Sequence, residues 1–278
     1  MRFVPFSMSV SRLILGLLLA FHGDLAASRP QNQPLRILPL GDSITRGSYL
    51  AQHVNGPYRG KAIGVANPKG GGWRKPLQDH LRAAGVAYDF VGELSYHAYG
   101  EAGSVDPAFD PDHHGLAGFG NRQILQGGTV PTPSDVLADL GISHITVPDL
   151  ATVLARQRPD IILLMSGANG FDAPARDELI RQISRLSSAH LFVATLPPQR
   201  PPRKGWEQVD AYNASLPAIV SAQQAAGHRI TLVEMNHAVG AEDLLPDGVH
   251  PGEEGLRKMA EAWFRALRTA GYAPPDAP

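Results

Sequence analysis

Residues 35–45 read LRILPLGDSIT, a largely apolar run that stops at Gly41 and is followed at once by Asp42 and Ser43. A short run of this kind, apolar at successive positions, is typical of a strand buried on both faces of a parallel sheet. Asp and Ser are preferred residues at the start of a helix. The stretch therefore predicts a strand that ends at Gly41 and leads into a helix.

Strand-like and helix-like segments alternate along the rest of the chain. Further apolar runs with the length of buried strands lie at residues 88–91, 160–165, 190–195 and 229–234. Segments with helical spacing lie at residues 75–84, 149–157, 176–187, 208–226 and 253–270. This alternation predicts an α/β fold with a mainly parallel central sheet covered on both faces. Residues 95–147 lack this alternation and are rich in Gly, Pro, Asp and His, so we expect a long surface loop there.

The composition narrows the class of protein. A chain of 278 residues with 43% hydrophobic content can bury one substantial core. A net charge of -1 creates no field that would attract nucleic acid, so we expect a small-molecule or polysaccharide ester as partner and no nucleic acid. Cysteine is absent, which excludes disulfides, thiolate metal sites and a cysteine nucleophile.

The first 28 residues have the features of a signal peptide. Arg2 and Arg12 supply positive charge, residues 13–21 form a short apolar run, and Leu25-Ala26-Ala27-Ser28 offers small residues for cleavage. The apolar run falls short of the roughly 20 residues that span a bilayer. We expect residues 1–28 to be removed on export, no stable membrane anchor, and residues 29–278 to form one domain of a secreted or periplasmic protein.

Ser43 is the first candidate for chemistry. A serine between a strand end and a helix start lies where backbone N–H groups point outward and can hold an oxyanion. The alternative is that Asp42 and Ser43 only cap the helix.

A second candidate site lies near the other end of the chain, in Pro246-Asp247-Gly248-Val249-His250-Pro251. A serine hydroxyl becomes a good nucleophile when a histidine accepts its proton, and that histidine needs a carboxylate to orient it. Asp247 and His250 are near enough to form this pair, and the chain order Ser, Asp, His is allowed. Because Asp-Gly is also a common turn signal, an ordinary loop is the alternative.

Two glycine-containing segments offer oxyanion donors. Ser166-Gly167-Ala168-Asn169-Gly170 follows the strand at 160–165, and sites in parallel sheets form at the carboxyl ends of strands. The Asn169 amide there could donate to a developing oxyanion. Residues 113–120, HHGLAGFG, allow close backbone approach to a ligand. The alternatives are a simple turn and a flexible loop.

Together these segments resemble the four blocks of the SGNH, or GDSL, hydrolase superfamily, in the same order along the chain. The matching residues are Gly41-Asp42-Ser43, Gly118, Gly167-Ala168-Asn169 and Asp247-Gly248-Val249-His250. GGWRKPL at 71–77, FVG at 90–92 and the His-Gly-rich segment before Gly118 also resemble its carbohydrate esterases of the acetylxylan-esterase type.

The resemblance implies a flavodoxin-like three-layer fold in which Ser43 attacks an ester. His250 would act as base and then acid, and Asp247 would orient it. The N–H groups of Ser43 and Gly118, with the Asn169 side chain, would form the oxyanion hole, for which Gly115 and Gly120 are alternatives to Gly118. The family usually has Asp where this chain has Gly170, and we expect Asp172 to replace it in part.

The resemblance predicts a serine carboxylic-ester hydrolase that removes acetyl or other short acyl groups from carbohydrate. A lipase-like or lysophospholipase-like enzyme for longer chains would share every catalytic residue, and a non-catalytic carbohydrate-binding protein would share the fold. Aromatic residues offered for an acyl pocket are Trp73, Phe119 and Trp206, although core packing is the more ordinary role for such residues.

No cofactor or metal is expected. Asp112, His113 and His114 are adjacent, with His53 and His97 upstream, but neighbouring histidines do not easily point at one ion and a helical H-x-x-x-H spacing is lacking. Asn213-Ala214-Ser215 matches a glycosylation sequon. Because Asn213 lies in a predicted helix, we expect it to pack inside the protein.

Overall fold

The computed structural model describes residues 33–50, 64–66, 71–94, 108–131 and 144–275, and Pro34–Pro278 is one compact domain. The predicted signal peptide, residues 1–28, lies outside the described residues, and so do His53 and His97. None of the helices in the described ranges is long and apolar enough to cross a membrane.

The core of the domain is a parallel sheet. Its main strands are β1 (Leu35–Gly41), β4 (Tyr88–Phe90), β8 (Ile161–Met165), β9 (His190–Ala194) and β10 (Ile230–Val233). They lie in the order β10-β9-β8-β1-β4, and every neighbouring pair is parallel. Counted along the chain, this is the 2-1-3-4-5 order of flavodoxin-like folds. The predicted parallel sheet is therefore confirmed.

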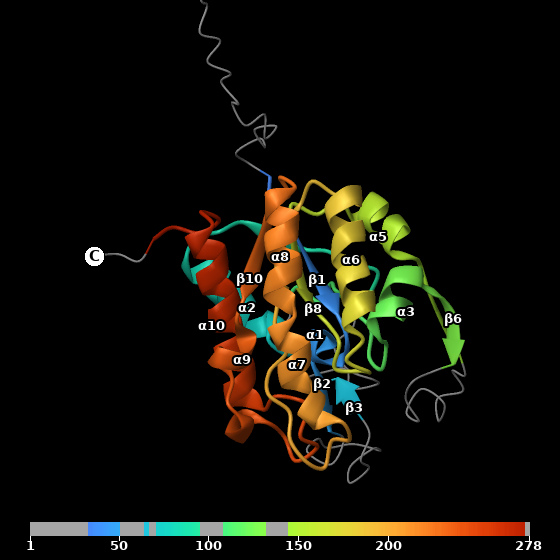
Figure 1. Ribbon diagram of the computed structural model, residues 1–278. Coiled ribbons are helices and arrows are strands. Elements are labelled where there is room, and N and C mark those ends of the chain that lie inside the picture. Colours follow the sequence, from blue (N-terminus) through green and yellow to red (C-terminus); the bar gives the residue numbers. More distant parts are fainter. Residues whose placement is uncertain (1–32, 51–63, 67–70, 95–107, 132–143, 276–278) are drawn as a thin grey trace, which may run out of the picture. The chain divides into compact units, whose positions relative to one another are not determined.

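Both faces of the sheet are buried, which explains why its strands are apolar at successive positions. In β8, Ile161 and Leu163 belong to one hydrophobic core, whereas Ile162 and Leu164 belong to the other. The first core is closed by α2 (Arg74–Ala83) and α10 (Glu253–Thr269). The second is closed by α5 (Leu150–Gln157), α6 (Ala173–Leu186) and α8 (Leu216–Ala225), of which α6 and α8 stand in front of the sheet in Figure 1. These three layers confirm the predicted fold class.

Two helices differ from their predicted bounds for local reasons. Helix α6 starts before residue 176 because Asp172 caps it: the Ala175 N–H donates to Asp172 Oδ1 at 2.9 Å. The predicted helix at 208–226 divides into η2 (Trp206–Gln208), α7 (Val209–Ala214) and α8. The break falls at Ser215 because Pro217, in the first turn of α8, has no N–H to continue the preceding helix.

The expectation of a loop throughout residues 95–147 is wrong for the part that the structure describes. That part holds β5 (His114–Gly115), α3 (Asn121–Gln126), β6 (Gly128–Pro131) and β7 (His144–Val147). Strand β5 extends the sheet beside the end of β1, and β6 pairs with β7 in antiparallel. These elements are too short for hydrophobic periodicity to reveal them.

The remaining short elements follow β1 and β10 along the chain. They are α1 (Ser43–Arg46), β2 (Ser48–Leu50), β3 (Gly64–Ala66), α9 (Met235–Ala238) and η3 (Ala241–Asp243). Strands β2 and β3 form a small antiparallel pair of their own.

Candidate active site

Ser43 lies at the switch point of the sheet, between β1 and β8. Ligand sites in open α/β sheets lie outside the carboxyl ends of the strands at this point. Gly41, the last residue of β1, is paired in register with Met165, the last residue of β8. A methyl group on Gly41 would lie 2.0 Å from the Met165 carbonyl oxygen, so only glycine allows the two strand ends to approach so closely.

The capping explanation holds for Asp42 but does not account for Ser43. The Ile44 N–H donates to Asp42 Oδ1 at 3.1 Å, which makes Asp42 the N-cap of α1. Helix α1 has 4 residues, so its macrodipole is weaker than that of a long helix. Any oxyanion at Ser43 must therefore be bound by individual N–H groups rather than by a long helix.

His250 lies between Ser43 and Asp247. Its Nε2 atom is 2.8 Å from Ser43 Oγ, and its Nδ1 atom is 2.6 Å from Asp247 Oδ2. The structure thus brings the three predicted triad residues into one hydrogen-bonded chain, although Ser43 and His250 are 207 positions apart. The side chains of His250 and Asp247 are 14% and 19% exposed, so neither is fully buried.

The charge of Asp247 determines where the His250 proton sits. Desolvation acts to raise the pKa of the Asp247 carboxyl, but hydrogen bonds from the His250 ring and from the N–H groups of Val249 and His250 outweigh it. The pKa therefore lies below its usual value, and the group is a carboxylate at neutral pH. A carboxylate only accepts hydrogen bonds, so Nδ1 carries the proton and Nε2 is left to accept one from Ser43.

A tight turn presents Asp247 and His250. The Gly248 N–H donates to the Leu245 carbonyl oxygen at 3.0 Å, and the Leu245 N–H donates to the His250 carbonyl oxygen at 2.8 Å. Gly248 has a φ of 72°, in the left-handed region that favours glycine. The Asp-Gly turn signal was therefore real, and the turn is what holds the pair in place.

Gly118 and Asn169 lie on two loops that meet. Asn169 Nδ2 donates to the carbonyl oxygen of Phe119, the neighbour of Gly118, at 3.1 Å. The alternative glycines use their N–H groups locally: Gly115 donates to His113 Nδ1 at 2.9 Å and Gly120 to Gln123 Oε1 at 2.9 Å. Within the described ranges, the Gly118 N–H has no such acceptor. Of the three glycines, Gly118 is thus the one whose N–H group is available to bind an oxyanion.

Asp42 has a second role that sequence reasoning missed. Its Oδ2 atom accepts hydrogen bonds from the N–H groups of Gly167 at 3.2 Å and Ala168 at 3.1 Å. Burial raises the pKa of the Asp42 carboxyl, and the hydrogen bonds from Ile44, Ala168 and Gly167 oppose that rise. Asp42, the residue next to Ser43, therefore holds the loop that carries Asn169.

Asp172 does not replace the carboxylate that the family usually has at position 170. Its Oδ1 atom caps α6, and its Oδ2 atom accepts from Arg122 Nη2 at 3.3 Å. The expectation that Asp172 supports the Asn169 loop is therefore not met, and Asp42 provides that support instead.

A buried polar network beneath the same loop was also missed. Ser166 Oγ donates to Asn121 Oδ1 at 2.7 Å, and Asn121 Nδ2 donates to the Tyr212 hydroxyl at 2.9 Å. That hydroxyl donates in turn to the Ser166 carbonyl oxygen at 2.8 Å. A methyl group on Gly167 would lie 2.1 Å from the Tyr212 hydroxyl. The three partners come from separate parts of the chain, so no local motif could have identified them.

The structure answers the packing questions raised by the sequence. Trp73 and Phe119 are buried in the two hydrophobic cores, whereas Trp206 is partly exposed in η2. Asn213 is buried, and its amide exchanges hydrogen bonds with the backbone of Leu196 at 2.8 and 2.9 Å. The predicted packing role of Asn213 is thus confirmed.

Within the described part of the chain, no three His, Asp or Glu side chains are grouped to hold a metal.

His114 should make the folded protein sensitive to acid. It is 1% exposed, and neither ring nitrogen has a hydrogen-bond partner among the described residues. Burial lowers its pKa to about 4, against the opposing effect of Glu93, whereas the pKa in an unfolded chain is about 6.5. Between these values the folded protein binds fewer protons than the unfolded chain. The free energy of unfolding should therefore fall as the pH drops from 6.5 to 4, by at most about 3 kcal/mol.

Urea unfolding at pH 7 and pH 4 measures this effect. His114→Leu keeps the volume and removes the titrating group, so its stability should depend less on pH than that of the wild type. His190, whose pKa burial also lowers to about 4, should keep part of the dependence in that variant. The exposed His237→Leu is the matched control and should behave as the wild type. An unchanged pH dependence in His114→Leu would contradict the assignment.

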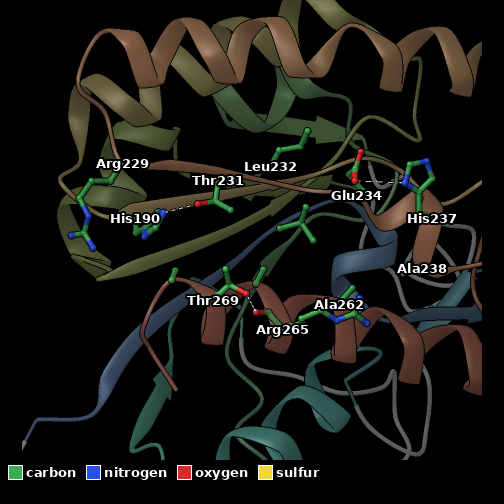
Figure 2. Close-up of a pocket in the computed structure, with 13 residues that line it drawn as sticks. His190, Arg229, Thr231, Leu232, Glu234, His237, Ala238, Ala262, Arg265 and Thr269 are labelled. Carbon is green, nitrogen blue, oxygen red and sulfur yellow. Dashed lines mark hydrogen bonds and ion pairs between the residues drawn. The ribbon is translucent and has the colours of Figure 1, made fainter. Parts of the chain in front are cut away.

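A groove along the edge strand β10 is separate from this site. Figure 2 shows it between β10, α9 and α10, with His190 and Thr231 joined by a hydrogen bond of 2.9 Å and His237 paired with Glu234 at 3.6 Å. None of the predicted catalytic or oxyanion residues lines this groove.

Comparison with known proteins places the chain in a family. A family model described as GDSL-like Lipase/Acylhydrolase matches residues 37–263. A multidomain esterase of Ruminococcus flavefaciens is 25% identical over 259 residues, which are 86% of this chain and 29% of that protein. A putative endoglucanase X of Acetivibrio thermocellus is 30% identical over 122 residues, which are 40% of this chain and 51% of that protein. The chain thus spans about half or less of the length of these two relatives.

A solved structure agrees with that placement. The family 3 carbohydrate esterase of Clostridium thermocellum superposes with a TM-score of 0.59, at 25% identity, over 86% of this chain and 97% of that one. The resemblance predicted from the four sequence blocks is confirmed, and the predicted ester hydrolase agrees with it. This chain belongs to the family of GDSL-like lipases and acylhydrolases.

Proposed function

We propose that this protein is a serine ester hydrolase that removes acetyl and other short acyl groups from carbohydrate. The observation that carries the proposal is the hydrogen-bonded chain from Ser43 through His250 to Asp247, with distances of 2.8 and 2.6 Å. This chain has the connections that activate a serine hydroxyl: a base beside the nucleophile and a carboxylate beside the base.

In the first half of the reaction, Ser43 Oγ attacks the carbonyl carbon of the ester while His250 Nε2 takes the hydroxyl proton. The imidazolium that forms is stabilised by the Asp247 carboxylate. The carbonyl oxygen becomes an oxyanion, which the N–H groups of Ser43 and Gly118 and the Asn169 amide bind. The tetrahedral intermediate then expels the alcohol, which takes the proton from His250, and an acyl-serine remains.

In the second half, water attacks the acyl-serine. His250, neutral again, takes a proton from that water, and the second tetrahedral intermediate is bound by the same donors. When it collapses, Ser43 Oγ leaves and recovers the proton from His250, and the carboxylic acid is released. Each oxyanion donor is worth about 2.7 to 4 kcal/mol of transition-state stabilisation in comparable enzymes, so the loop that Asp42 holds in place contributes directly to the rate.

The similarity to a solved carbohydrate esterase supports a carbohydrate ester as substrate, and the similarity to a multidomain esterase supports ester hydrolysis. The signal-peptide features of residues 1–28 support action outside the cell, where polysaccharide is found. Both statements are proposals for this chain.

An activity panel tests the proposal. The purified protein should release acetate from acetylated xylan and should hydrolyse aryl acetates at least about tenfold faster than aryl octanoates, because a short acyl pocket discriminates against added methylenes. Ser43→Ala serves as the blank. Equal or faster hydrolysis of the octanoate would reject the short-acyl part in favour of a lipase-like enzyme. Binding of acetylated xylan without hydrolysis of any ester would reject the enzyme altogether.

A further inference from the structure

The segment of residues 199–203, which follows β9, contacts both halves of the candidate active site. On one side, Arg203 Nη2 donates to the carbonyl oxygen of Ala168, next to Asn169. On the other side, the Arg200 N–H donates to the carbonyl oxygen of Gly248, between Asp247 and His250, at 3.0 Å. A methyl group on Gly248 would lie 2.0 Å from the Arg200 carbonyl oxygen, so the two backbones are in close contact.

The Arg200 side chain holds the segment that leads into the turn of His250. Its Nε atom donates to the Ala241 carbonyl oxygen at 3.1 Å. Its Nη2 atom donates to the carbonyl oxygens of Leu244 at 3.1 Å and Leu245 at 3.3 Å. Bonds from a charged guanidinium are stronger than neutral ones, and its planar arrangement of donors fixes several acceptors at once.

That segment is in turn bonded to His250. The Leu245 N–H donates to the His250 carbonyl oxygen at 2.8 Å, and Leu244 pairs with Pro251 in an antiparallel bridge. The Leu244 carbonyl that Arg200 binds and the Leu245 N–H that binds His250 therefore belong to the same peptide group. A shift of residues 241–245 would move the imidazole relative to Ser43.

We propose that Arg200 is a positioning residue that sets the place of His250 opposite Ser43. The proposal rests on the proposed function. Arg200 acts on the reaction through the backbone of the turn, so its removal lengthens the bond between His250 and Ser43 without removing a group that binds substrate. A misplacement of about 1 Å in a catalytic group can cost about 100-fold in rate.

Arg200→Ala and Arg200→Lys test the proposal with an aryl acetate as substrate. Arg200→Ala should lower kcat by about 10- to 100-fold and leave KM within about twofold. Arg200→Lys keeps the charge but lacks the planar fork, so its kcat should lie between those of the wild type and the alanine variant. Added ethylguanidinium should restore part of the kcat of Arg200→Ala and leave the wild type unchanged.

The matched control is Arg181→Ala, which removes an exposed arginine from α6 and should leave kcat unchanged. Circular dichroism shows which variants are folded, and Arg200→Lys decides the question if the alanine variant does not fold. Wild-type kcat in a folded Arg200 variant would overturn the proposal, and so would a raised KM with unchanged kcat. Activity retained by Ser43→Ala would instead overturn the proposed function, so the two failures are distinguishable.

Discussion

Ser43→Ala, His250→Ala and the double variant should all lower kcat by about the same factor, on the order of 10⁴ to 10⁶. His250 Nε2 lies 2.8 Å from Ser43 Oγ, and every proton that it takes or gives in the proposed mechanism serves the formation or the breakdown of the acyl-serine. Once either member is gone, removing the other costs little more, because the two act as one unit. The residual rate should come from the oxyanion donors and from substrate binding.

Single-turnover and steady-state hydrolysis of an aryl acetate measure the three rates. His237→Ala is the matched control, because it removes an exposed histidine from α9, and it should keep the wild-type kcat. Losses that multiply in the double variant would show that Ser43 and His250 act independently, which would contradict the proposed mechanism.

Asp247→Asn should lower kcat by about 10⁴ at neutral pH while the protein stays folded. The reason is that the two oxygen atoms of the Asp247 carboxylate have different partners. Oδ1 accepts the N–H groups of Val249 and His250, both at 3.0 Å, so in the variant the amide oxygen must take this place. The amide nitrogen then faces His250 Nδ1 and makes that atom an acceptor. The ring proton moves to Nε2, which can no longer accept the proton of Ser43.

The matched control is Asp149→Asn, since Asp149 also accepts a backbone N–H, from Thr152 at 2.7 Å, but at the start of α5. It should keep the wild-type kcat. Thermal unfolding of both variants separates loss of activity from loss of structure. A kcat of Asp247→Asn close to that of the wild type would show that the carboxylate does not set the tautomer of His250.

Much of this architecture could be predicted from local sequence patterns. Apolar runs such as residues 160–165 identify strands because burial on both faces of a parallel sheet requires apolar residues at successive positions. The helical spacing of residues 253–270 identified α10 for a similar reason. Short elements such as α3 escaped, because Ile124 is one of few buried residues in it and leaves no periodic signal.

Sequence patterns likewise predicted only part of the candidate site. The sequence by itself offered Ser43, Asp247 and His250 as candidates, because strand ends, turn signals and the residue types of a triad are visible in short segments. The resemblance to the family's blocks then favoured them over a helix cap and an ordinary loop. The tertiary structure alone decided that Asp42 holds the N–H groups of Gly167 and Ala168, and that Arg200 holds the turn of His250. These contacts join loops that follow different strands. They depend on the register of β1 with β8 and on the path of the chain after β9, and no spacing within one segment encodes either.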